Sequence, residues 1–154
     1  KTYSALLRGL ADNAENGNHA ALEKMHDILN SMGDVANVIH CNIYLNALVR
    51  SASTQKVQDG ATDRCMSFLG EMIISDTYKP DRITYNTAMN FLVKMVVEGD
   101  DEAAEKCLVL INEMKNSNET PDVVTYSTAM KAFSKLAERG HDGAVQKNLK
   151  LLRH

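Results

Sequence analysis

The sequence predicts an all-α fold in which helix–turn–helix repeats stack into a solenoid. Two observations lead to this prediction. One sequence motif recurs along the chain. Lys79–Phe91 reads KPDRITYNTAMNF and Thr120–Phe133 reads TPDVVTYSTAMKAF, and looser copies begin at Asn37 and Thr2. The marker positions of the four copies also lie 38, 44 and 41 residues apart, a period typical of helical repeat proteins. The markers are Tyr3, Cys41, Tyr85 and Tyr126.

Composition narrows the class of protein further. The hydrophobic fraction of 44% and the charged fraction of 24% are those of a globular chain. Because no run of eighteen apolar residues occurs, we expect no membrane span. The three cysteines lack CxxC spacing, which favours buried thiols in a reduced compartment. A net charge of −3 neither requires nor excludes a nucleic-acid partner.

Each marker opens an amphipathic helix. Apolar residues follow at i+4, i+7 and i+11 in all four copies, and a period of 3.6 residues places them on one stripe. These are the first helices of the four repeats. The four stripes are Tyr3/Leu7/Leu10/Ala14, Cys41/Leu45/Leu48/Ala52, Tyr85/Met89/Leu92/Val96 and Tyr126/Met130/Phe133/Ala137.

Three of these helices carry start signals. Pro80 and Pro121 cannot continue a preceding helix, and the residues that follow them, Asp81 and Asp122, are good N-caps. Asn37 can cap the second copy in the same way. A carboxylate also suits the positive end of the helix dipole.

A second helix follows each first helix after a glycine turn. The glycines are Gly17, Gly99 and Gly140, each 14 residues after its marker. The expected caps of the second helices are Asn18, Asp100 or Asp101, and Asp142. The expected apolar stripes are Met25/Leu29/Met32, Cys65/Leu69/Met72 and Cys107/Ile111/Met114. We therefore predict one helical-repeat domain over 1–154, with units at about 1–37, 38–81, 82–122 and 123–154.

The recurring phrase resembles that of a known family. Ile83–Met89 and Val124–Met130 are similar to the first helix of a pentatricopeptide repeat. Glu71-Met72 before Pro80-Asp81, and the later Asn112–Lys115 before Pro121-Asp122, resemble the end of its second helix and the link to the next repeat. The resemblance implies a right-handed α-solenoid. The repeats here are longer than the roughly 35 residues usual for such units, which bears on how repeats match successive bases.

The same resemblance implies a function. Pentatricopeptide proteins bind single-stranded RNA in a mitochondrion or plastid such as the chloroplast, with about one base read per repeat. They act in RNA processing, stability or translation, so we expect no enzyme activity and no cofactor. The family's pairing of readers implies an A/U-rich ligand, with adenine for Ser4/Asn37, uracil for Asn42/Asp81 and for Asn86/Asp122, and a purine for Ser127. The implied base readers are Ser4, Asn42, Asn86 and Ser127 on the first helices and Asn37, Asp81 and Asp122 at the repeat ends.

Two further sets of residues accompany the readers. An aliphatic residue three positions before the reader would sandwich the base, and a cation eight positions after it would contact phosphate. The first copy breaks the cation pattern, because Asp12 stands there. The sandwiching residues are Ile39, Ile83 and Val124, and the cations are Arg50, Lys94 and Lys135.

Structural roles remain open for all of these positions. Asp81 and Asp122 cap helices whatever the function, and the cations can be ordinary solvated residues. The alternative function is a protein-binding scaffold subunit of an organellar ribosome or of a membrane-complex assembly. The five histidines lack i,i+4 pairing and nearby cysteines, so the sequence favours neither a metal site nor a catalytic one.

Overall fold

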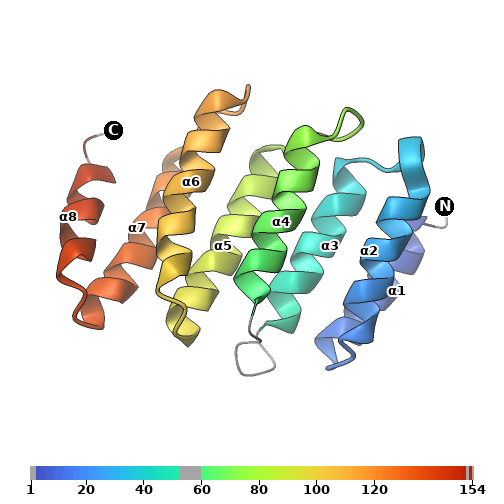
Figure 1. Cartoon of the computed structure of the whole chain (residues 1–154), viewed down its shortest axis with the longest axis horizontal. Helices are drawn as coiled ribbons and strands as arrows, with labels where there is room; N and C mark the ends of the chain where they lie inside the picture. Colours follow the sequence, from blue (N-terminus) through green and yellow to red (C-terminus); the bar gives the residue numbers. More distant parts are fainter. Residues whose placement is uncertain (1–2, 53–59, 152, 154) are drawn as a thin grey trace. The chain divides into compact units, whose positions relative to one another are not determined.

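The computed structural model describes residues 3–52, 60–151 and 153, which contain helices and no strand (Figure 1). This confirms the all-α class. Each of the four expected units contributes one pair of α-helices, while the stacking of the units into a solenoid remains a prediction. The helices are α1 (Tyr3–Glu15), α2 (Ala20–Met32), α3 (Val38–Ser51), α4 (Ala61–Ile74), α5 (Arg82–Glu98), α6 (Glu102–Asn116), α7 (Val123–Glu138) and α8 (Asp142–Leu151), with a short 3₁₀ turn η1 (Gly33–Val35) after α2.

The chain divides into two compact units, Lys1–Ala88 and Met89–His154, and the boundary lies within α5. In the first unit α1 packs on α2 and α3, and α2 also packs on α3 (Figure 1). Leu7, Met25, Leu45 and Met72 are fully buried in this unit. Tyr3 departs from its expected stripe with 42% exposure, because it begins α1 before the packed part of that helix.

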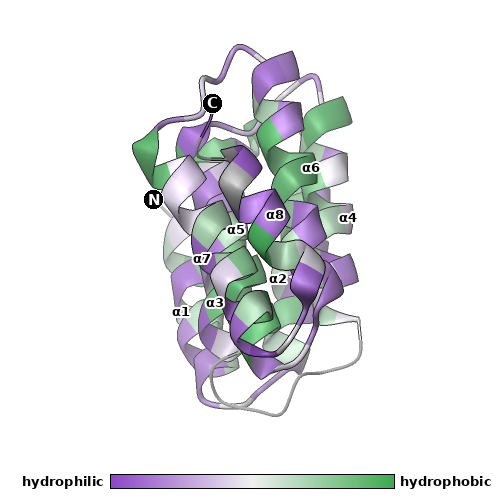
Figure 2. Ribbon diagram, turned by 90° about the vertical axis from the view of Figure 1, so that its left-hand side faces the viewer, coloured by the Kyte–Doolittle hydropathy of each residue, from purple (hydrophilic) through white to green (hydrophobic). Residues whose placement is uncertain are grey.

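In the second unit α7 lies between α6 and α8 and contacts both. Phe133 and Met114 are fully buried, whereas Tyr126 and Met130 are only half-buried. The buried face of α7 runs along Ala129, Ala132, Phe133 and Leu136, so the expected stripe is rotated by about one position. In α8, hydrophilic and hydrophobic segments alternate along the ribbon, as in an amphipathic helix (Figure 2).

The first-helix caps are as predicted. Asn37 Oδ1 accepts hydrogen bonds from the backbone N–H groups of Ile39 at 3.0 Å and His40 at 3.2 Å. Asp81 Oδ1 accepts from the N–H of Thr84 at 2.8 Å. Asp122 Oδ1 accepts from the N–H of Thr125 at 2.9 Å. These bonds satisfy N–H groups that the first helical turn leaves without intrahelical partners.

The second-helix caps are not as predicted, although the turns are. Gly17, Gly99 and Gly140 adopt φ of 93°, 117° and 86°, which side chains with a Cβ rarely tolerate. Asn18 stands before the N-cap position of α2, which His19 holds without a side-chain cap bond.

Asp101 holds the N-cap position of α6 and also makes no cap bond, because its carboxylate faces Arg139 and His141 instead. Asp142 is already inside α8. In these helices the backbone turn itself satisfies part of the first-turn N–H groups, since Ala21 and Ala103 donate to the carbonyls of Asn18 and Asp100.

The three cysteines are free and fully buried, as the sequence predicts. Burial raises the pKa of the Cys41, Cys65 and Cys107 thiols to about 12. They are therefore protonated core residues at neutral pH. Within the described part of the chain, no helix is both long and apolar enough to cross a membrane.

Candidate functional site

Two of the expected base readers meet in the first unit. Asn42, in the first turns of α3, places its Nδ2 3.4 Å from Oδ1 of Asp81, the residue that caps α5. The Thr84 hydroxyl lies between them, 2.8 Å from Asn42 Oδ1 and 2.7 Å from Asp81 Oδ1. Thr84 is fully buried, and its oxygen accepts a hydrogen bond from the Asp81 N–H at 3.1 Å. The three side chains thus form one network between α3 and α5.

The charge state of the Asp81 carboxyl group determines how this network is oriented. Burial alone would raise the pKa of its carboxyl group, but hydrogen bonds from the Thr84 hydroxyl, the Thr84 N–H and Asn42 outweigh that effect and lower the pKa below its ordinary value. Asp81 is therefore ionised at neutral pH and can only accept hydrogen bonds. Asn42 turns its NH₂ group towards Asp81 and its oxygen towards the Thr84 hydroxyl, whose single proton can be donated to either Asp81 Oδ1 or Asn42 Oδ1. One N–H and one lone pair of the amide remain for a ligand.

The other expected readers lie at or near the starts of their helices. Ser4 is half-buried on α1 and Asn37 is exposed before α3, and no hydrogen bond joins them within the described residues. Asn86 is half-buried on α5. Ser127 is exposed on α7, and Asp122 is the cap of that helix.

The expected sandwiching residues are exposed apolar side chains at helix starts. Ile39 is 58% exposed on α3 and Ile83 is 63% exposed on α5, both in the first unit. Val124, in the second unit, is 55% exposed on α7. Each is available to a planar ligand, which would remove apolar surface from water on contact.

The expected phosphate contacts are engaged within the protein. Arg50 forms an ion pair with Glu15 and lies 3.8 Å from Asp12. Lys135 pairs with Glu138 at 2.9 Å. Lys94 is half-buried on α5. Exposed pairs of this kind contribute only about 0–1 kcal/mol, so a phosphate can compete for these cations.

Sequence reasoning missed two parts of the site. Thr84 belongs to the repeated phrase, and its position three residues after Asp81 is the signal that could have identified it as the centre of the network. The second part is a groove of about 560 Å³ between α1 and α3. It is lined by Arg8, Ala11, Asp12, Ile43, Asn46, Ala47 and Arg50.

A charged cluster in the second unit was also missed. Arg139, which follows α7, donates to the carbonyl of Val96 at 2.7 Å and approaches Asp101 at 2.9 Å. His141 Nε2 lies 2.8 Å from the other oxygen of Asp101. The cluster joins the turn after α5 to the turn after α7.

Comparison with known proteins adds no identity to these observations. The chain matches no protein-family model, and no curated protein matches it.

Proposed function

We propose that this chain is a non-catalytic, pentatricopeptide-like helical-repeat protein that binds single-stranded RNA in a mitochondrion or plastid. Under this proposal the repeats stack as a right-handed solenoid, and each reads about one base. Holding a transcript in this way would serve its processing, stability or translation. The proposal rests chiefly on one observation, the contact of Asn42 with Asp81 through Thr84.

The chemistry of this pair suits a base edge. Asp81 fixes the orientation of the Asn42 amide, which leaves that amide one donor and one acceptor. Uracil offers a complementary N3–H donor and carbonyl acceptors on its Watson–Crick edge. A pre-oriented amide binds such an edge without losing its rotational freedom on binding.

Base stacking complements this hydrogen bonding. Ile39 and Ile83 lie in the first turns of the helices that carry Asn42 and Asn86, and both are more than half exposed. A base inserted between side chains of this kind gains apolar contact whatever its identity. Stacking on aromatic platforms is worth about 1–3 kcal/mol per base. We expect a smaller value for an aliphatic contact.

Fluorescence anisotropy of the chain with labelled oligomers tests this function. A short RNA containing A-U-U-A should bind more tightly than a C-rich RNA of equal length, and its binding should weaken between about 50 and 200 mM salt. Equal and negligible binding of both oligomers would reject the proposal.

A protein-binding scaffold is the second candidate, and exposed apolar residues outside the reader positions favour it. Ile74 is 80% exposed at the end of α4, and Val109 and Val145 are 45% and 49% exposed on α6 and α8. Large apolar side chains at such exposure would be removed from water by contact with another protein subunit. Negligible RNA binding by the folded chain would favour this candidate.

A further inference from the structure

The groove between α1 and α3 lies on the helix faces that carry the expected readers. Arg8 and Asp12 follow Ser4 by four and eight residues on α1, and Asn46 and Arg50 follow Asn42 by the same steps on α3. Residues at i, i+4 and i+8 share one side of a helix. All four side chains line the groove. The groove therefore lies one to two helical turns beyond Ser4 and Asn42, towards the C-terminal ends of α1 and α3.

The charges of the two helices are arranged differently in this groove. In α1 the cation stands at the fourth position, as Arg8, and an acid stands at the eighth, as Asp12. In α3 the fourth position is the neutral Asn46 and the eighth is Arg50. The acid of one helix therefore faces the cation of the next.

Arg50 and Arg8 differ in their ion pairing. Two carboxylates, Asp12 at 3.8 Å and Glu15, neutralise the guanidinium of Arg50. Arg8 is exposed and has no ion-pair partner among the described residues. An incoming anion can therefore bind Arg8 without breaking an existing pair, whereas it must displace Asp12 or Glu15 to bind Arg50.

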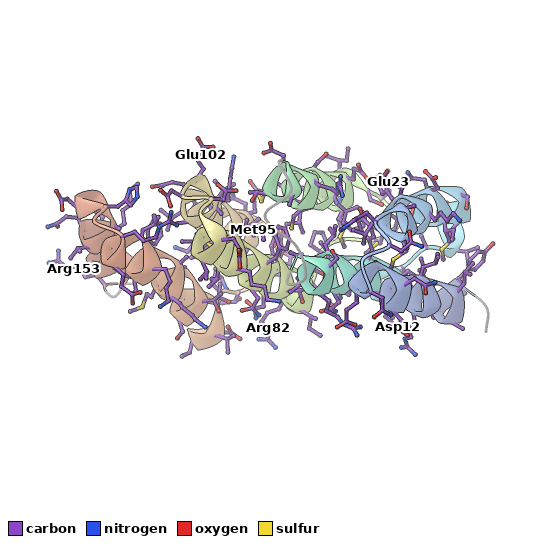
Figure 3. All side chains as sticks on the ribbon, turned by 90° about the horizontal axis from the view of Figure 1, so that it is seen from below. Asp12, Glu23, Arg82, Met95, Glu102 and Arg153 are labelled. Atoms are coloured by element: carbon purple, nitrogen blue, oxygen red, sulfur yellow. The ribbon has the colours of Figure 1, made fainter. Side chains whose placement is uncertain are left out.

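Figure 3 shows on which side of the first unit Asp12, one of the residues that line the groove, lies. Asp12 projects from α1 on the side of the first unit opposite to Glu23 of α2. The groove has apolar walls at Ala11, Ile43 and Ala47, and its volume of about 560 Å³ exceeds that of a single phosphate group. It can therefore hold a phosphate together with the attached sugar.

We propose that the Arg8–Arg50 groove binds a backbone phosphodiester of single-stranded RNA, with Arg8 as the direct contact. This inference rests on the proposed function. The planar guanidinium of Arg8 offers two parallel N–H donors that match phosphate oxygens. Arg50 is held by Asp12 and Glu15 and contributes less. Asp12 opposes the bound anion and limits the affinity of the groove.

Salt-dependent anisotropy with the A-U-U-A oligomer separates these roles. For a single strand, each phosphate contact contributes about 0.7 to the slope of log affinity against log salt concentration. Arg8→Gln should lose most of one such contact, and Arg50→Gln should lose less. Asp12→Asn should strengthen binding at low salt. The matched control is Arg64→Gln, because Arg64 of α4 also makes an interhelical ion pair, with Glu23 at 3.7 Å, but lies outside the groove.

The outcomes distinguish this inference from the proposed function. A wild-type slope in folded Arg8→Gln, with RNA binding by the unaltered chain, overturns the groove site and leaves the proposed function intact. An equal loss in Arg8→Gln and Arg64→Gln also overturns it, because the effect is then one of net charge alone. Absence of RNA binding by the unaltered chain overturns both proposals. Circular dichroism of each variant checks that the helices are retained.

Discussion

Two polar clusters connect successive first helices, and they differ in how they are built. In the first unit, Asn42, Asp81 and Thr84 join the starts of α3 and α5 through hydrogen bonds of 2.7 to 3.4 Å, and Thr84 is fully buried. In the second unit, Arg139 and Asp101 join the turns after α7 and α5 through side chains that are 39% and 35% exposed. In the first cluster, uncharged donors surround the Asp81 carboxylate. In the second cluster, the Arg139 guanidinium pairs with the Asp101 carboxylate and also donates to the Val96 carbonyl near the end of α5.

Because of this difference, the two clusters should contribute unequally to the stability of the fold. A buried hydroxyl that loses its partners leaves desolvated groups behind, so the first cluster should be costly to disturb. The second cluster is screened by solvent and should contribute less. Only the first cluster presents free donor and acceptor sites of fixed orientation, which is what base recognition requires.

Thr84→Val should have the largest effect on stability. Valine keeps the shape of threonine but leaves Asp81 N–H, the Asp81 carboxylate and Asn42 Oδ1 without the hydroxyl. We expect the free energy of unfolding to fall by about 1–3 kcal/mol in urea denaturation. The control is Thr87→Val, the same change at a half-exposed position of α5. Similar losses in the two variants would show that the network has no special importance.

Arg139→Gln should have a smaller effect. The change removes the ion pair with Asp101 and the charged hydrogen bond to the Val96 carbonyl near the end of α5. We expect a loss of about 1 kcal/mol, which added salt should reduce for the ion-pair part. Lys131→Gln, on the exposed side of α7, is the control for the charge change. A loss larger than that of Thr84→Val would reverse the ranking of the two clusters.

The contribution of Asp81 to stability should depend on pH. Because the pKa of Asp81 is lowered in the folded state, its contribution is fully present above the ordinary value of 3.8 and is lost as pH falls through the lower folded value. The stability difference between the wild type and Asp81→Asn should therefore be greatest near neutral pH and shrink below about pH 4. Urea denaturation at several pH values measures it, with the exposed Asp76→Asn as the control. A difference that grows on acidification would contradict the assigned direction.

The two clusters also show how far the sequence alone could lead. The repeated Pro-Asp-x-x-Thr phrase determines a local helix start, so the helices, the glycine turns and the caps at Asp81 and Asp122 could all be predicted. The meeting of Asn42 with Asp81 was expected only from the family resemblance, because 39 residues separate them. The pairs Arg139–Asp101 and Arg50–Glu15 were not predicted. Long flexible side chains can reach several partners, and only the packing of the helices decides among them.

A substitution at Asn42 tests whether Asn42 and Asp81 read a base. Asn42→Ser keeps a short polar side chain beside Asp81 but removes the oriented amide. In anisotropy competition between oligomers that differ only at the base assigned to this pair, the wild type should prefer uracil, and Asn42→Ser should shift the preference towards a purine. A lost hydrogen bond of about 0.5–1.5 kcal/mol corresponds to a change of roughly twofold to tenfold. An unchanged preference in a variant with wild-type circular dichroism would contradict the reading role of Asn42 and Asp81.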